Sequence, residues 1–139
     1  MTQPPVSLQP ERGLARFAGE GGKALLLLAL LAFAARGWTF GNPVIHVDDQ
    51  FYLLAGERLL DGVWPYADLW DRKPVGLFLL YAAIVWLFPD PVLGYQIAAA
   101  LCVAATAWLV FRMARSFASF GAALAGGAAY VAWLPLFGG

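Results

Sequence analysis

Residues 92–111 read VLGYQIAAALCVAATAWLVF, an unbroken run of twenty residues without a charged side chain. At about 1.5 Å per helical residue this run is about 30 Å long, which is the thickness of the hydrocarbon core of a bilayer. Its most polar members are Gln96 and Thr106. We therefore expect a membrane-spanning helix over about 91–111.

The composition of the whole chain agrees with a membrane protein. Of 139 residues, 61% are hydrophobic and 13% are charged, and the mean hydropathy is +0.68. This composition strongly disfavours a soluble monomer and excludes a disordered chain. Nine basic residues balance nine acidic ones, so no basic excess favours nucleic acid as a partner. The single Cys102 cannot form a disulfide or a thiolate metal site within the chain. The fold class predicted is all-α integral membrane.

Two other apolar runs are long enough to span a membrane, and one is too short. The first covers about 24–45 and is interrupted only by Arg36, whose guanidinium must reach towards the interface. The second covers 117–137 and is rich in glycine and alanine, which let another helix approach closely. The short run, 75–88, has fourteen residues and would form a helix of only about 21 Å.

The positions of the basic residues predict the orientation of the spans. Basic residues before the first span favour an inner amino terminus: Arg12, Arg16 and Lys23. With three spans (24–45, 91–111 and 117–137), Arg112 and Arg115 also fall inside. A fourth span over 75–88 would place that pair outside. We predict three transmembrane helices, with 75–88 lying at the outer interface, and four transmembrane helices as the alternative.

The segment before the first span, residues 1–23, is interpreted as a flexible cytoplasmic lead because it contains several prolines and a Gly-Gly pair. A secretory signal peptide is the alternative, since the small residues of 32–34 resemble a cleavage site. Glu11 and Glu20 disfavour that alternative, because the region preceding the apolar part of a signal peptide is normally basic. Residues 24–139 are expected to form one membrane domain with an outer loop over 41–90.

The outer loop, 41–90, holds seven of the nine acids and only three bases. Asp48 and Asp49 stand where the N-cap of a helix over about 50–61 belongs, and Gly62 follows as its C′ residue. The apolar residues of this segment recur at helical spacing on one face, which is typical of a helix resting on a membrane or protein surface. Capping and catalysis are both open interpretations of the acidic pair.

Residues 64–74, WPYADLWDRKP, combine aromatic rings with charge. They can form an interfacial aromatic belt. Alternatively, Arg72 and Lys73 bind a phosphate while the rings flank a sugar or an isoprenoid chain. No cofactor motif is found, although a divalent metal held by Asp48, Asp49 and His46 is a further alternative.

The order of these parts resembles the amino-terminal part of the GT-C superfamily of polytopic glycosyltransferases. The resemblance lies in VDDQFYLLA (47–55), LLDGVWPY (59–66) and DLWDRKP (68–74), which precede an apolar run. It is a resemblance to the bacterial protein O-mannosyltransferase-like and lipid A aminoarabinose transferase-like enzymes. It covers about 24–139, and 48–74 is its specific core. Because these enzymes are several times longer, the chain is expected to be an amino-terminal fragment that is inactive by itself.

The resemblance implies transfer of a sugar from a polyprenyl-phosphate donor to a hydroxyl of a lipid, glycan or protein acceptor, at the outer face of the cytoplasmic (inner) membrane. Asp48 and Asp49 match the acidic pair of the active site, with Asp replacing the more usual Glu at 49. Tyr52 matches the aromatic residue that follows, and Lys73 the lysine near the lipid phosphate. A carboxylate can accept the acceptor's proton, while Lys73 and Arg72 stabilise the departing phosphate.

Two other functions are open from the residues alone. A small membrane assembly or binding subunit without catalytic activity would use the acidic loop to dock a partner. Part of a transporter or polymerase of lipid-linked saccharides would share the aromatic, charged loop but would need no base at Asp48.

Overall fold

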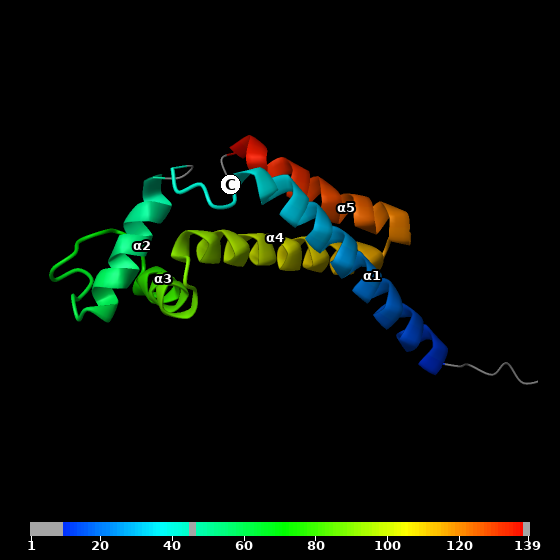
Figure 1. Ribbon diagram of the computed structural model, residues 1–139. Helices are drawn as coiled ribbons and strands as arrows, with labels where there is room; N and C mark the ends of the chain where they lie inside the picture. Colours follow the sequence, from blue (N-terminus) through cyan, green and yellow to red (C-terminus); the bar gives the residue numbers. More distant parts are fainter. Residues whose placement is uncertain (1–9, 45–46, 138–139) are drawn as a thin grey trace, which may run out of the picture. The chain divides into compact units, whose positions relative to one another are not determined.

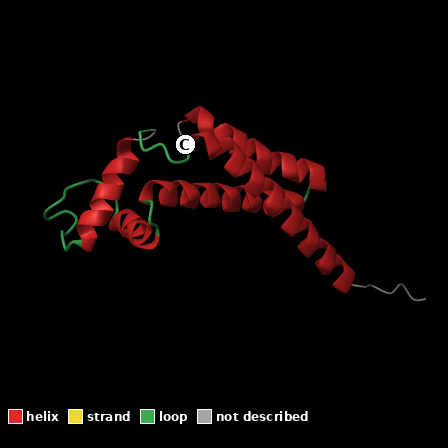
Figure 2. Cartoon of the chain, viewed as in Figure 1, coloured by secondary structure: helices red, strands yellow, loops and turns green. Residues whose placement is uncertain are grey.

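The computed structural model describes the backbone of residues 10–44 and 47–137, and the side chains of 19–44 and 48–135. Over this part of the chain the structure is helical, with five α-helices and no strand (Figures 1 and 2). The chain divides into two compact units. One comprises the residues up to Ala35 together with those from Val103 onward, and the other comprises Arg36–Cys102.

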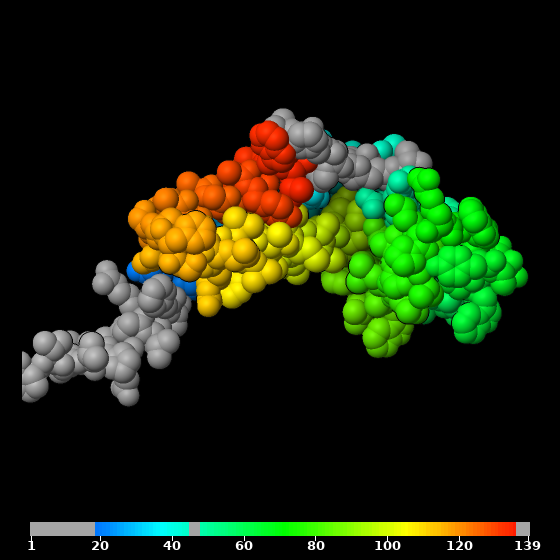
Figure 3. All heavy atoms as spheres, turned by 180° about the vertical axis from the view of Figure 1, so that it is seen from behind, coloured from blue at the N-terminus to red at the C-terminus, as the bar shows by residue number. Residues whose placement is uncertain are grey.

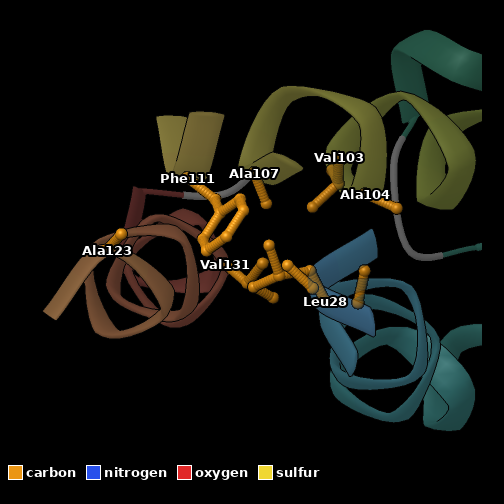
Figure 4. Packing of buried hydrophobic residues seen from close by; sticks show 9 residues of the cluster. Leu28, Val103, Ala104, Ala107, Phe111, Ala123 and Val131 are labelled. Atoms are coloured by element: carbon orange, nitrogen blue, oxygen red, sulfur yellow. The ribbon is translucent and has the colours of Figure 1, made fainter. Parts of the chain in front are cut away.

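The first unit contains α1 (Pro10–Arg36) up to Ala35, the second half of α4 (Pro91–Arg115), α5 (Phe120–Trp133) and the 3₁₀ helix η2 (Leu134–Phe137). Its core consists of nine buried side chains from the three α-helices, several of which point towards one another in Figure 4: Ala24, Leu28, Ala32, Val103, Ala104, Ala107, Phe111, Ala123 and Val131. A Cβ atom at Gly127 would lie 2.8 Å from the Ala107 carbonyl oxygen. The close helix approach expected in the small-residue run is therefore present at Gly127.

Polar contacts join the start of α1 to the end of α4. The Arg115 guanidinium forms an ion pair of 3.0 Å with the Glu20 carboxylate. Two turns earlier in α4, Trp108 Nε1 donates a hydrogen bond of 3.0 Å to the Gly21 carbonyl. The Arg112 guanidinium lies 5.1 Å from the centre of the Trp108 ring, in a cation–π arrangement. These contacts show that α1 and α4 run antiparallel within this unit.

Within the described residues, two segments are long and apolar enough to cross a membrane: Gly19–Thr39, with 21 residues, and Pro91–Arg115, with 25 residues. They correspond to the spans predicted over 24–45 and 91–111. The third predicted span, 117–137, is represented by α5 with only 14 residues, so this helix alone falls short of the required length.

The helix boundaries differ from the predicted ones for local reasons. The first helix ends at Arg36 rather than near 45, because a 3₁₀ turn (η1, Gly37–Thr39) follows and Gly41 adopts a positive φ of 76°. This helix also begins at Pro10, so residues 10–23 are helical where a flexible lead was expected. Helix α5 begins only at Phe120, because the Ser119 side chain caps it by accepting a hydrogen bond from the Ala122 N–H.

The second unit contains α2 (Val47–Leu60), α3 (Val75–Leu87) and the beginning of α4. Gly62 ends α2 as predicted, with a φ of 89° and the two hydrogen bonds of a Schellman motif: Gly62 N–H to Leu59 O and Val63 N–H to Arg58 O. The helices predicted over 50–61 and 75–88 are thus both present, although α2 begins earlier. Seven side chains form the core of this unit: Tyr52, Leu53, Ala55, Phe78, Tyr81, Ile84 and Tyr95.

Gly56 allows α2 and α3 to pack at a very short distance. A Cβ atom at this position would lie 2.6 Å from the backbone nitrogen of Ala82 and 2.7 Å from the backbone carbonyl carbon of Tyr81. Only a glycine fits between these two backbones without a shift. The contact fixes the spacing of the two helices that carry the candidate site.

Candidate functional site

The acidic pair lies in the first turn of α2. Since this helix begins at Val47, Asp48 and Asp49 follow its first residue, and the predicted N-cap role of either acid is wrong. Both carboxylates are still favourably placed, because the amino-terminal end of a helix carries partial positive charge. Asp48 is exposed to solvent and Asp49 is partly buried. The two neighbouring acids thus have different surroundings.

Asp49 is held by a tyrosine of α3. The Tyr81 hydroxyl donates a hydrogen bond of 2.6 Å to Asp49 Oδ1. Tyr81 is 7% exposed, and burial raises the pKa of its hydroxyl far above the usual value, with the hydrogen bond to Asp49 and the negative charge of Asp49 acting in the same direction. The hydroxyl therefore remains protonated at neutral pH and acts as the donor in this contact.

An aromatic cluster fixes the position of the Tyr81 ring. The ring of Tyr52 lies 5.6 Å from that of Tyr81, and the ring of Tyr95 lies 5.9 Å from it on another helix. Tyr52 itself is 8% exposed and also packs near Phe78, with 6.4 Å between ring centres. The predicted lipid-phosphate residue Tyr52 is thus part of the core, and its contact with a phosphate stays a prediction.

A buried amide ties the end of the first apolar segment to α4. Gln96 is 6% exposed, and its Oε1 accepts a hydrogen bond of 2.7 Å from the Gly41 N–H. Its Nε2 donates a hydrogen bond of 3.0 Å to the Asn42 carbonyl. Gln96 therefore satisfies backbone groups that the turn at 41–42 leaves without helical partners, which explains a polar side chain in an otherwise apolar run.

The basic pair lies on the loop between α2 and α3. Tyr66 organises this loop: it has a positive φ of 71°, its N–H donates to the Leu69 carbonyl, and its hydroxyl donates to the Lys73 carbonyl. Its ring packs edge-on to Phe78 of α3 at 6.0 Å. Arg72 is exposed and Lys73 is partly buried. The loop is thus a hydrogen-bonded structure that holds the backbone of Lys73 against α3.

The same loop presents two indole rings to the surface. Trp64 is 71% exposed and Trp70 is 78% exposed. The backbone N–H of Trp64 donates a hydrogen bond to Asp68 Oδ2, and the backbone N–H of Asp68 donates one to the Trp64 carbonyl. Figure 3 shows the loop in green at the surface of this unit. The exposure agrees with both interpretations of 64–74, an interfacial belt and a surface for a sugar or isoprenoid chain.

The second unit contains all five predicted site residues: Asp48, Asp49, Tyr52, Arg72 and Lys73. Among the described residues, Asp49 and Tyr52 both contact Tyr81. No hydrogen bond or ion pair within this part of the chain joins Asp48 or Asp49 to Arg72 or Lys73. His46, the third ligand of the alternative metal site, lies outside the described residues. Within the described residues, no group of three metal-binding side chains is found.

Tyr81 was not predicted as a site residue. It lies in the apolar run 75–88, where the hydrophobic pattern indicates only a helix. The one feature of the sequence that could have indicated its role is the tyrosine hydroxyl, because a buried tyrosine normally finds a hydrogen-bond partner. The sequence alone does not identify that partner, which is 32 residues away. No protein-family model, curated protein or solved structure matches the chain.

Proposed function

We propose that the chain forms the amino-terminal part of a membrane glycosyltransferase that moves a sugar from a polyprenyl-phosphate donor to an acceptor hydroxyl. The observation that carries the proposal is the unequal acid pair at the start of α2. Asp49 is held by Tyr81, while Asp48 is exposed. An exposed carboxylate beside a fixed one suits general base catalysis, because it can reach the proton of a bound hydroxyl.

The α2–α3 loop supports the proposal from the donor side. Arg72 and Lys73 would bind the lipid phosphate and stabilise the charge that develops on it as the sugar departs. The hydrogen bond from the Tyr66 hydroxyl to the Lys73 carbonyl restricts the loop backbone, so less conformational entropy is lost when a phosphate binds. The exposed rings of Trp64 and Trp70 would lie along the sugar or the isoprenoid chain.

We further propose three membrane crossings, with the amino terminus inside and the loop over 41–90 outside. Because Glu20 and Arg115 form an ion pair, the start of α1 and the end of α4 belong on the same side of the membrane. An additional crossing by α3 would put them on opposite sides. Helix α3, with 13 residues, is about 20 Å long, which suits an interfacial position.

The third crossing would use α5 together with η2. The 14 residues of α5 rise about 21 Å, and the four residues of η2 add about 8 Å at the steeper 3₁₀ rise. The sum, about 29 Å, matches the hydrocarbon core of a bilayer.

The function is tested with Asp48→Asn in the protein expressed from its complete coding sequence. Transfer of sugar from a synthetic polyprenyl-phosphate sugar is measured in membranes. We expect a loss of at least about 100-fold, because general acid–base catalysis contributes roughly 10²–10⁴-fold. Asp61→Asn, which changes another exposed acid of the same unit, is the matched control and keeps full activity. Unchanged transfer by Asp48→Asn would remove Asp48 from the mechanism.

The topology is tested by labelling single cysteines in intact cells with a membrane-impermeant maleimide. In a Cys102→Ser background, Asp61→Cys is expected to react from outside. Ser116→Cys, just after α4, is expected to react only after the cells are permeabilised. Reaction of Ser116→Cys in intact cells would contradict the three-crossing arrangement.

A further inference from the structure

We propose that Tyr81 is a positioning residue that divides the acid pair, holding Asp49 in place and leaving Asp48 as the carboxylate that meets the acceptor hydroxyl. This inference rests on the proposed function and assigns a separate role to each acid.

The helical geometry of α2 sets the direction in which each acid points. Asp49, Leu53 and Gly56 are spaced i, i+4 and i+7, so they share one face of the helix. Gly56 contacts the backbone of α3, and Leu53 is buried. Asp49 therefore faces α3. Asp48 is rotated by about 100° from that face, which explains why it is exposed.

The Tyr81 side chain, which donates the hydrogen bond to Asp49, is held rigidly by its neighbours. The Tyr81 ring is buried between Tyr52 and Tyr95, and the backbone at Tyr81 lies against Gly56. A tyrosine has only two side-chain torsions before its ring, so packing the ring also fixes where the hydroxyl lies. The hydrogen bond then fixes one oxygen of Asp49, and hydrogen bonds to ionised carboxylates are among the stronger ones in proteins.

The hydrogen bond from Tyr81 gives the two acids different roles in catalysis. One oxygen of the Asp49 carboxylate accepts a hydrogen bond from Tyr81, so this carboxylate is already used in a contact within the protein. Among the described residues, the neighbouring Asp48 carboxylate makes no such contact, and it is exposed to solvent. Small displacements of reacting groups are costly, and an error of 1 Å can lower a rate by about 100-fold. Loss of the Tyr81 hydroxyl should therefore lower kcat by about 10–100-fold through displacement of the first turn of α2.

A spectroscopic experiment tests the contact itself, without any assay of function. Ionisation of the tyrosines is followed by ultraviolet absorbance as the purified protein is titrated with alkali in detergent. The charged and titratable groups facing Tyr81 are Asp49 and Tyr52 on α2 and Tyr95 on α4. Asp49→Asn removes the negative charge, so the pKa of Tyr81 falls and more tyrosinate forms before the protein unfolds.

Asp48→Asn is the matched control for this titration, because it removes the adjacent, exposed charge. We expect its titration curve to follow that of the parent protein. Equal curves for Asp49→Asn and the parent, or equal shifts for both variants, would overturn the division of the pair.

A kinetic experiment in the complete protein tests the consequence. Tyr81→Phe keeps the ring and should lower kcat while leaving KM for the polyprenyl-phosphate sugar unchanged. In an Asp49→Asn background the same substitution should have no further effect, because its partner is already altered. Tyr130→Phe, which removes a hydroxyl in the first unit, should change neither constant.

The outcomes separate the inference from the proposed function. A parent protein that transfers no sugar refutes the function, and the titration still decides whether Tyr81 holds Asp49. An active parent with an unaltered Tyr81→Phe variant refutes the positioning role. A rise in KM together with the fall in kcat would also refute it, because that pattern indicates a damaged binding site.

Discussion

Replacing Gly56 by alanine places a methyl group where α2 meets the backbone of α3. The new carbon would lie 2.6 Å from the Ala82 nitrogen and 2.7 Å from the Tyr81 carbonyl carbon. Nonbonded carbon atoms pack at roughly 3.5 Å or more, so the 2.7 Å contact with the Tyr81 carbonyl carbon requires the helices to separate locally by about 0.8 Å. Both atoms belong to the backbone, and no side chain can rotate away to relieve the contact.

The expected cost follows from two opposing effects. Overpacking a well-packed core usually costs about 1–3 kcal/mol. Alanine is a better helix former than glycine and returns up to about 1 kcal/mol. We therefore expect Gly56→Ala to lower the free energy of unfolding by up to about 2 kcal/mol, and to lengthen the hydrogen bond between Tyr81 and Asp49.

Thermal unfolding in detergent, followed by circular dichroism, measures this effect. Gly76→Ala is the matched control, because Gly76 lies in α3 with no atom within 4 Å of the position of its Cβ. This variant should be as stable as the parent or slightly more stable. If Gly56→Ala unfolds at the same temperature as Gly76→Ala, the close contact between α2 and α3 is refuted.

Other predictions concern the cores and the response to pH. Gly127→Ala should destabilise the first unit by about 1–3 kcal/mol in thermal unfolding, whereas Gly126→Ala, which has free space, should not; equal stabilities would contradict the close approach to α4. Phe78→Ala should cost about 3–5 kcal/mol because the ring is fully buried, and a cost below about 1 kcal/mol would disprove its core position. Folding raises the pKa of the Tyr81 hydroxyl above its unfolded value of about 10, so the protonated hydroxyl stabilises the folded state fully below pH 10 and progressively less as the pH rises further. Thermal unfolding between pH 8 and 11 should therefore show a smaller fall in the melting temperature at high pH for Tyr81→Phe than for the parent.

Part of the candidate site could be predicted from local sequence, and part could not. The acids at 48 and 49, the glycine that ends α2 and the short helix after Pro74 all follow from residue type and spacing. The hydrogen bond between Tyr81 and Asp49 spans 32 residues and depends on how two helices pack. The N-cap prediction for the acids was wrong because α2 begins one residue before Asp48, and helix ends are set by local hydrogen bonds that hydropathy does not detect.

The sequence by itself determined the helical class, the two long apolar helices and the concentration of acids between them. Those properties depend on composition and on the length of each apolar run, which are local. Only the tertiary structure decided which acid is exposed and which is held, and that α1 and α4 run antiparallel with Glu20 paired to Arg115. These features depend on contacts between residues far apart in the chain, and such contacts are fixed by the packing of helix faces rather than by the pattern along any one helix.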